Sequence, residues 1–273
     1  MHNKNKKVVT KFWNMSLYLT RLKDRLVALV GENRDINHWF QTKVTIIKAD
    51  TYSQVGLAET ETLGKIYVKR YSAKFCWHRL AMLLVLGRPV KCFKMSSALL
   101  EHGLPVPEPY GLITAKGFFG FPHSSYDLCQ GLIDAEDLKS FYMAADDSHS
   151  AIIKDRLQCV GRQLAQLHNA GYMHGDCKWS NILLQGTEVF FVDLDNSRKT
   201  FGRDAEAKDL ARFILNAEEL AIGKVAFECF INAYCETRNN ASITLMSSSK
   251  FQLDKLRIKH LARYGDRGER LMG

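Results

Sequence analysis

One stretch decides the fold of this chain: Gly171-Tyr-Met-His174-Gly-Asp176-Cys-Lys178-Trp-Ser-Asn181, followed after an interval by Val189-Phe-Phe-Val-Asp193-Leu-Asp195. A single loop here carries a carboxylate, an amine and an amide, and a second carboxylate follows an apolar, strand-like segment. Phosphoryl transfer needs these groups, because a carboxylate orients the acceptor hydroxyl, a cation meets the phosphate charge and hard oxygen ligands hold magnesium. A lone His-Gly-Asp also fits an ordinary turn, so the interpretation depends on the loop, the strand and the second Asp occurring together.

The pattern His174-Gly-Asp176-x-Lys178-x-x-Asn181 resembles the catalytic loop of protein-kinase-like enzymes, and Asp193 falls where that fold keeps its metal-binding Asp. His-Gly-Asp replaces His-Arg-Asp, and Asp-Leu-Asp replaces Asp-Phe-Gly. Both changes point away from eukaryotic-type protein kinases and toward bacterial kinases of small molecules and sugars. From about Lys65 to Leu215 the chain is similar to the lipopolysaccharide core kinases, which phosphorylate heptose or Kdo.

The resemblance implies an α+β, bilobal protein-kinase-like fold, with a small β-rich N-lobe and a mainly helical C-lobe. It also implies ATP and Mg²⁺ as cofactors. The site residues that it implies are Asp176 and Lys178 for catalysis, Asn181 and Asp193 for the metal, Lys69 for the nucleotide phosphates, and the backbone of Gln130, Gly131 and Leu132 for adenine. Asp195 is a further candidate for the metal or the acceptor.

The expected domains are a basic helical extension over residues 1–40, an N-lobe over 41–131 and a C-lobe over 132–273. The apolar pattern of residues 1–31 predicts a helix that ends at Gly31. At 273 residues, the chain is long enough for one bilobal enzyme with a substantial core.

Residues rich in β-branched and aromatic side chains predict strands over 44–48, 54–59 and 65–71. The prolines of residues 105–109 predict an extended connection into a strand over 110–114, and the resemblance implies a last N-lobe strand over 124–129. Two features depart from the kinase pattern in this lobe. The loop between the first two of these strands contains no glycine, so a Gly-rich phosphate cradle is absent. The only acidic residue between Lys69 and Gly103 is Glu101, whereas a kinase helix usually places the Glu partner of this lysine earlier.

In the C-lobe, acids at residues 134–137 predict the start of a helix, and the apolar stripe of residues 152–170 predicts an amphipathic helix that leads into the loop. We interpret Asp209 as a brace of the loop backbone, and His168 and His174 as structural residues. No long activation segment follows Asp195, which favours an acceptor other than a peptide.

The seven cysteines are scattered and odd in number, so neither a disulfide framework nor a zinc site is indicated. No signal peptide is visible, and we expect a cytoplasmic protein. The net charge of +9 favours an anionic partner. The basic segment over 250–270 makes peripheral contact with the anionic inner membrane a candidate, as does the apolar, cation-flanked segment 75–86. No nucleic-acid-binding module is present.

The function predicted from these features is ATP-dependent phosphorylation of a heptose or Kdo sugar of the lipopolysaccharide inner core. Three alternatives stay open: a small-molecule phosphotransferase of the aminoglycoside or choline kinase type, an atypical protein kinase, and a pseudokinase scaffold. The missing glycines and the displaced Glu favour the scaffold, whereas the complete set of loop and metal residues favours an enzyme.

Overall fold

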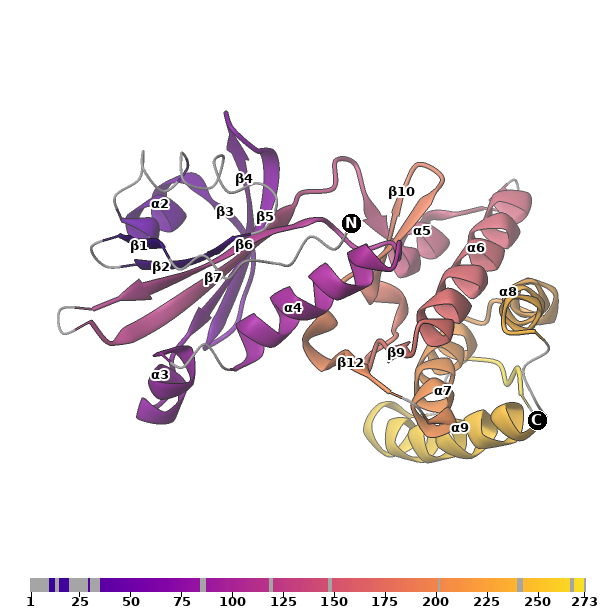
Figure 1. Cartoon of the computed structure of the whole chain (residues 1–273). Helices are drawn as coiled ribbons and strands as arrows, with labels where there is room; N and C mark the ends of the chain where they lie inside the picture. Colours follow the sequence, from indigo (N-terminus) through magenta and orange to yellow (C-terminus); the bar gives the residue numbers. More distant parts are fainter. Residues whose placement is uncertain are drawn as a thin grey trace, which may run out of the picture. The chain divides into compact units, whose positions relative to one another are not determined.

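The computed structural model describes residues 10–12, 15–19, 29, 35–83, 87–117, 120–146, 149–200, 202–239, 243–265 and 268–272. The chain forms two compact units (Figure 1). The first consists of Met1–Ala98 and Pro107–Ile133, and the second of Leu99–Val106 and Asp134–Gly273. The α+β class expected from the sequence is confirmed.

The first unit is built on an antiparallel sheet with the strand order β1-β2-β6-β7-β5-β4-β3. Its strands are β1(Thr10–Phe12), β2(Met15–Leu19), β3(Thr45–Ala49), β4(Ser53–Thr60), β5(Gly64–Ser72), β6(Pro109–Lys116) and β7(Pro122–Gln130). The five predicted strands are confirmed to within two residues at each end. The predicted helix over 1–31 is wrong for residues 10–12 and 15–19, because β2 pairs with β6 and extends the sheet. The rest of that predicted helix, Leu29 apart, lies outside the described residues.

A helix not predicted from the sequence, α2(Ile36–Lys43), packs on this sheet. Its buried Ile36, Trp39 and Phe40 share one core cluster with sheet residues that include Ile66 and Val68. Asn37 on the same helix accepts a 2.6 Å hydrogen bond from the Tyr126 hydroxyl of β7. Two further helices follow β5, α3(Cys76–Leu83) and α4(Arg88–Glu101), and the division between the units falls within the last turn of α4.

The second unit is mainly helical. Its helices are α5(Leu138–Ala144), α6(Ser150–Asn169), α7(Arg203–Glu219), α8(Lys224–Thr237) and α9(Ile243–Tyr264). The helix predicted from Asp134 onward begins later, because Asp134 has a positive φ of 51° and Glu136–Asp137 forms the short strand β8. Asp137 then caps α5, accepting a hydrogen bond from the Ser140 amide.

Two small sheets frame the loop of the second unit. The strands β10(Ile182–Gln185) and β11(Glu188–Phe191) form a hairpin beside β8, and β9(Tyr172–Met173) pairs with β12(Arg198–Lys199). Short 3-10 turns at Trp179–Asn181 and Leu194–Asn196 connect these strands to the loop. The loop of residues 174–181 therefore begins at the end of β9 and leads into the start of β10.

The core of the second unit is aromatic. Phe213 of α7 stacks on Phe230 of α8 with ring centroids 4.0 Å apart, and Trp179 of the loop packs against Phe213 at 5.3 Å. Gly161 lets α6 approach α8 closely, because a Cβ at this position would lie 2.4 Å from the Phe230 carbonyl oxygen. This packing gives the loop a rigid base.

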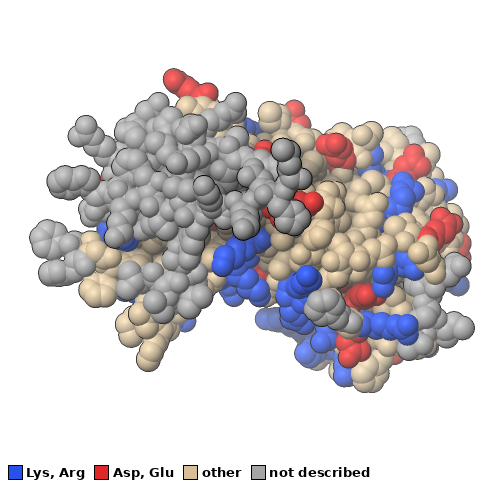
Figure 2. Space-filling model, in the orientation of Figure 1, with Lys and Arg blue, Asp and Glu red and all other residues tan. Residues whose placement is uncertain are grey.

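Among the described residues, basic side chains are concentrated on one part of the second unit. Figure 2 shows lysine and arginine side chains collected on the second unit around β12 and α7, where Arg198, Lys199 and Arg203 are exposed. Among the described helices, none combines the length and the apolar content that a membrane span requires.

Candidate active site

The second unit brings four of the predicted site residues together: Asp176, Lys178, Asn181 and Asp193. The register of the β10–β11 hairpin is the cause, because it pairs Ile182 with Phe191. The residues flanking that pair are joined by a 3.0 Å hydrogen bond from the Val192 amide to the Asn181 carbonyl. Asp193, the next residue, has a left-handed φ of 59°, which turns the chain at the end of the strand.

The carboxylate of Asp176 is the centre of this group. Its Oδ2 lies 3.2 Å from the Lys178 amine and accepts a 3.3 Å hydrogen bond from Asn181 Nδ2. Its Oδ1 lies 3.3 Å from Nε of Arg212, a residue of α7 that the sequence did not single out as a site residue. The Asp176 side chain is 24% exposed, so an acceptor can reach it.

The Asn181 amide is oriented by two contacts. Its nitrogen donates to the Asp176 backbone carbonyl at 3.0 Å as well as to the carboxylate. Its Oδ1 has no protein partner within the described part of the chain, so this oxygen can serve as a metal ligand. A carboxylate and an amide oxygen are suitable ligands for Mg²⁺.

Asp209 of α7 holds the backbone of the loop. Its buried carboxylate accepts hydrogen bonds from the amides of His174 at 2.6 Å and Gly175 at 2.8 Å. His168 Nε2 lies 3.3 Å from the same carboxylate, and His168 Nδ1 lies 2.7 Å from the Tyr234 hydroxyl. The bracing role predicted for Asp209 and the structural role predicted for His168 are confirmed.

His174 is also structural. Its Nδ1 accepts from the Asp176 amide at 3.3 Å, and its Nε2 donates to the Val192 carbonyl at 3.1 Å. These two roles require the neutral ring. Burial lowers the pKa of His174 below its usual value, although Asp209 and Asp176 act in the opposite direction. The loop histidine therefore remains neutral and joins the loop to the end of β11.

Cys177, the other loop side chain of chemical interest, is fully buried. Burial raises the pKa of its thiol well above the usual value, and the nearby carboxylates of Asp209 and Asp176 raise it further. A thiol with a raised pKa is a poor nucleophile. This environment does not favour a nucleophilic role for Cys177.

The other predicted site residues lie in the first unit. Lys69 is on β5, on the face opposite the buried Ile66 and Val68. The strand register places Asp127 of β7 directly across from Lys69. The sequence did not indicate Asp127, because the kinase pattern places the acidic partner of this lysine on the helix after β5, whereas Asp127 lies on the neighbouring strand.

Three backbone positions were predicted to meet adenine. The Gln130 amide already donates to the Glu108 carbonyl at 2.9 Å, and the Gly131 amide donates to the Lys65 carbonyl at 3.0 Å. The Leu132 amide has no protein partner in the described residues. The amides of Gln130 and Gly131 are therefore used within the protein, whereas the amide of Leu132 is not used by the described residues.

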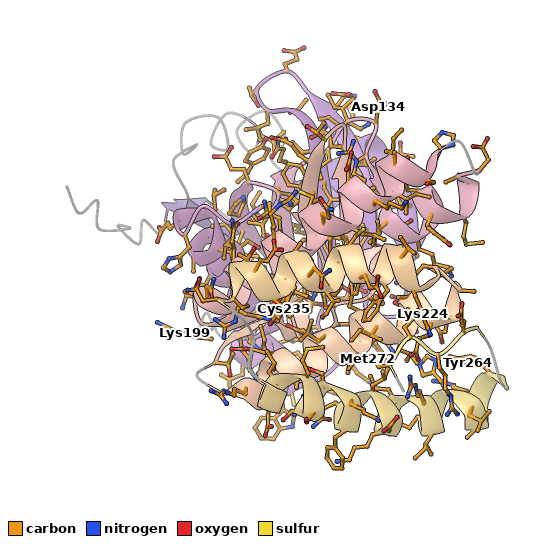
Figure 3. The ribbon with its side chains drawn as sticks, turned by 90° about the vertical axis from the view of Figure 1, so that its right-hand side faces the viewer. Asp134, Lys199, Lys224, Cys235, Tyr264 and Met272 are labelled. Atoms are coloured by element: carbon orange, nitrogen blue, oxygen red, sulfur yellow. The ribbon has the colours of Figure 1, made fainter. Side chains whose placement is uncertain are left out.

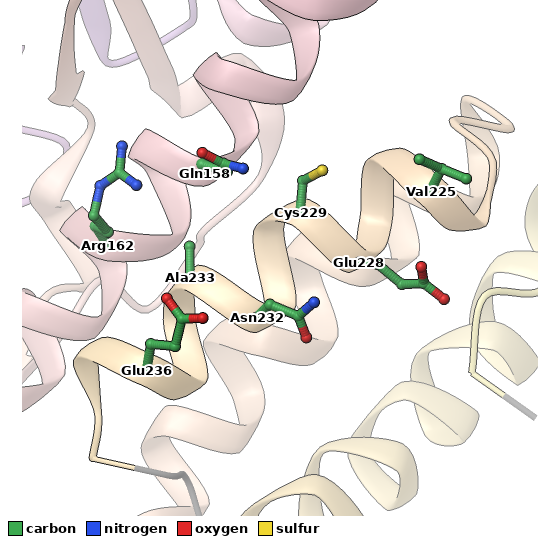
Figure 4. Close-up of a pocket in the computed structure, with 8 residues that line it drawn as sticks. All are labelled: Gln158, Arg162, Val225, Glu228, Cys229, Asn232, Ala233 and Glu236. Atoms are coloured by element: carbon green, nitrogen blue, oxygen red, sulfur yellow. The ribbon is translucent and has the colours of Figure 1, made fainter.

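A separate cavity of about 340 Å³ lies between α6 and α8 (Figure 4). Its lining includes Arg162, Glu228 and Glu236, and none of the predicted site residues contributes to it. Charges of both signs line this cavity, and it is distinct from the loop.

The chain is similar in sequence to a known family of kinases. The model of the lipopolysaccharide kinase (Kdo/WaaP) family matches residues 37–234. A 3-deoxy-D-manno-octulosonic acid kinase of Haemophilus influenzae (strain 86-028NP) is 29% identical over 124 residues, which cover 44% of this chain and 49% of the relative. The kinase of the same name from Vibrio parahaemolyticus is 27% identical over 123 residues, covering 45% and 49%. The chain thus spans about half the length of the curated relatives it matches.

A solved structure described as WaaP in complex with acyl carrier protein has the same fold. The TM-score is 0.58 at 16% sequence identity, and the match covers 88% of this chain and 98% of that one. This likeness confirms the protein-kinase-like fold. Because the family model matches most of the chain, from α2 to α8, the protein belongs to the lipopolysaccharide kinase (Kdo/WaaP) family.

Proposed function

We propose that this protein is an ATP- and magnesium-dependent kinase that phosphorylates a sugar hydroxyl of the lipopolysaccharide inner core. The observation that carries the proposal is the grouping of Asp176, Lys178 and Asn181 on one braced loop, with Asp193 two residues beyond the end of the β10–β11 pairing. Kdo is the first acceptor to test, because the sequence relatives named above are 3-deoxy-D-manno-octulosonic acid kinases. Heptose is the second.

In this proposal each residue has one task. Asp176 orients the acceptor hydroxyl and receives its proton, and Lys178 stabilises charge on the transferred phosphoryl group. Lys69 contacts the nucleotide phosphates, and the amide of Leu132 donates to adenine.

Asn181 and Asp193 would hold Mg²⁺, which neutralises charge on the phosphates when it is bound. The described residues contain no cluster of three or more His, Cys, Asp or Glu side chains suited to a metal. Two protein ligands fit Mg²⁺ that arrives with a nucleotide, since phosphate oxygens and water complete its coordination. We therefore expect Asn181→Ala and Asp193→Ala to raise the Mg²⁺ concentration needed for half-maximal turnover.

The first experiment is mass spectrometry of the lipopolysaccharide core from cells that lack the protein. The cells are complemented with the wild type, with Asp176→Ala, or with Asp155→Ala, which removes an exposed acid of α6 as a control. We expect one phosphate to be lost and then restored by the wild type and the control alone. An unchanged core in the absence of the protein contradicts the glycan acceptor.

Purified protein separates the alternatives. Transfer of phosphate from ATP to Kdo-containing lipid A precursor supports the proposal. Turnover only on free small molecules or only on peptide identifies one of the other kinase classes. Nucleotide binding without transfer to any acceptor identifies a pseudokinase scaffold.

We also propose peripheral contact with an anionic membrane through α9. Apolar side chains on its outer face are strongly exposed, with Ile258 at 69% and Phe251 at 59%. Lys255 lies 4.0 Å from the centre of the Phe251 ring, and Lys259 and Arg263 are exposed on the same helix. Figure 3 shows a row of α9 side chains projecting away from the unit, with Tyr264 near its end. Mixed apolar and basic side chains are typical of helices that lie in a lipid interface.

Not every basic residue of α9 is available to lipid. Arg257 makes ion pairs with the buried Glu218 and with Asp254. Glu218 raises the pKa of Arg257, so the residue stays charged and acts within the protein.

Co-sedimentation with vesicles tests the lipid contact. We expect the wild type to bind phosphatidylglycerol vesicles but not phosphatidylcholine vesicles, and Phe251→Ser with Ile258→Ser to reduce binding. Val225→Ser, at an exposed apolar position of α8, is the matched control. If only Trp77→Ser reduces binding, the exposed face of α3 is the lipid contact and the assignment to α9 is wrong.

A further inference from the structure

The carboxylate of Asp176 has most of its hydrogen-bonding capacity filled by protein. An ionised carboxylate has about four lone-pair sites. Lys178 and Asn181 contact Oδ2, and Arg212 contacts Oδ1. One lone-pair site of the carboxylate is left for the acceptor hydroxyl. The direction in which this site points is set by the three contacts, because they fix the plane of the carboxylate.

Arg212 is the contact that comes from outside the loop. It lies on α7, one turn after the brace Asp209, and its side chain is 28% exposed. A second contact holds its guanidinium, because Nη1 lies 3.4 Å from Nε2 of His260 on α9. The guanidinium is therefore held at two points, by the loop and by α9.

His260 is in turn fixed by α7. Its Nδ1 lies 2.6 Å from Oε1 of Glu219. A carboxylate can only accept here, so Nδ1 carries the proton and Nε2 is free to accept from Arg212. This arrangement orients the imidazole toward Arg212.

The Glu219 carboxylate is also linked to the loop through Asn216. Glu219 Oε2 accepts a 2.9 Å hydrogen bond from Asn216, whose Oδ1 accepts a 3.1 Å hydrogen bond from the Trp179 amide. Loop, α7 and α9 thus form one connected polar network within the second unit. The loop contributes Asp176 and Trp179, α7 contributes Arg212, Asn216 and Glu219, and α9 contributes His260.

We propose that Arg212, held in place by His260, is a positioning residue that sets the orientation of the Asp176 carboxylate for phosphoryl transfer. This inference rests on the proposed function, in which Asp176 orients the acceptor hydroxyl. Arginine suits the task because its planar guanidinium contacts Asp176 and His260 at once, whereas a lysine supplies a single flexible point charge. The C-terminal helix α9 then contributes to the geometry of catalysis as well as to packing.

The test is steady-state kinetics of purified wild type, Arg212→Ala, Arg212→Lys, His260→Ala and the double variant Arg212→Ala with His260→Ala. Arg162→Ala, an exposed arginine of α6, is the matched control. For Arg212→Ala we expect kcat to fall about 100-fold, since small misplacements of a reacting group have effects of this size. KM for ATP and for the acceptor should stay within about twofold, because Arg212 acts through Asp176 and binds neither substrate.

The other variants separate the contribution of the Arg212 charge from that of its orientation. Arg212→Lys should recover part of kcat, because it keeps a cation near Asp176. His260→Ala should lower kcat about tenfold, and the double variant should be no slower than Arg212→Ala, since groups that act through one contact are not additive. If Arg212→Ala does not fold, as judged by circular dichroism, Arg212→Lys and His260→Ala carry the test.

Three results overturn the inference. They are an unchanged kcat in Arg212→Ala, an increase in acceptor KM with unchanged kcat, which would make Arg212 an acceptor-binding residue, and additive losses in the double variant. If Arg212→Ala does not fold, unchanged kcat in both Arg212→Lys and His260→Ala overturns it equally. A wild type that transfers no phosphate contradicts the proposed function instead, so the two failures are distinguishable.

Discussion

Gly175 allows the backbone to turn sharply between His174 and Asp176. Its φ is +85°, and a Cβ at this position would lie 2.4 Å from the backbone carbonyl oxygen of Asn196. Gly186, in the β10–β11 turn, also has a positive φ, of +56°, but a Cβ there would meet nothing within 4 Å. Alanine substitutions at the two glycines therefore measure two free-energy costs separately. Gly186 reports the cost of the left-handed dihedral angle alone, and Gly175 reports that cost together with the steric clash.

We expect Gly186→Ala to lower the free energy of unfolding by about 1–2 kcal/mol, the cost of a left-handed conformation for alanine. Gly175→Ala should cost about 1–3 kcal/mol more, because the loop must also move away from Asn196. Urea unfolding of both variants measures the difference. Equal losses would show that the contact between the loop and Asn196 is not tight.

Asp209 connects α7 to the loop through two hydrogen bonds from backbone amides. Asp209→Ala leaves the amides of His174 and Gly175 without an acceptor in a buried site. We expect a loss of about 2–5 kcal/mol in the free energy of unfolding. Asp155→Ala, at an exposed acid of α6, should change it by less than about 0.5 kcal/mol. A similar small effect at Asp209 in urea unfolding would show that the loop amides find other partners.

At the scale of the element, α5 depends on a capping residue. Asp137 accepts hydrogen bonds from the Ser140 amide at 3.0 Å and the Ser140 hydroxyl at 2.7 Å. The helix matters for the site because its Tyr142 packs edge-on against Trp179 of the loop, with ring centroids 5.8 Å apart.

Removal of the cap in Asp137→Ala should lower the free energy of unfolding by about 1 kcal/mol, while Asp137→Ser, which can still cap, should lower it by less. Thermal and urea unfolding of the two variants provide the measurement. Equal losses would mean that the pairing of Asp137 with Leu183 in the β8–β10 ladder, and not the cap, is the important contact.

At the scale of the whole molecule, positive charges exceed negative charges. The net charge is +9, and the α9 face combines cations with exposed apolar side chains. Electrostatic attraction to lipid is screened by salt, since the Debye length falls from about 10 Å at 0.1 M to about 3 Å at 1 M, whereas apolar insertion is not.

We therefore expect binding to phosphatidylglycerol vesicles to weaken strongly between these salt concentrations while a residual component persists. The residual component should be lost in Phe251→Ser with Ile258→Ser. Co-sedimentation at several salt concentrations measures both components. Binding that does not respond to salt would contradict the contribution of the basic side chains.

Local features of this protein can be predicted from its sequence alone. Stretches rich in β-branched and aromatic residues predicted β3, β4 and β5, the prolines before residue 110 predicted β6, and the spacing from Asp176 to Asn181 indicated the loop. These predictions succeeded because each depends on residues that are close together in the chain. The second carboxylate was also recognisable, because a single hairpin connects Asn181 to Asp193.

The residues that support the loop from elsewhere in the chain are brought to it by packing between helices and strands. Arg212 of α7 contacts Asp176, His260 of α9 contacts Arg212, and Asp127 faces Lys69 because of the strand register. The strands β1 and β2 were mistaken for a helix, because β2 pairs with β6, a strand far along the chain, and β1 pairs with β2. Side-chain partners and edge strands are set by packing between elements, and local sequence patterns carry little information about that packing.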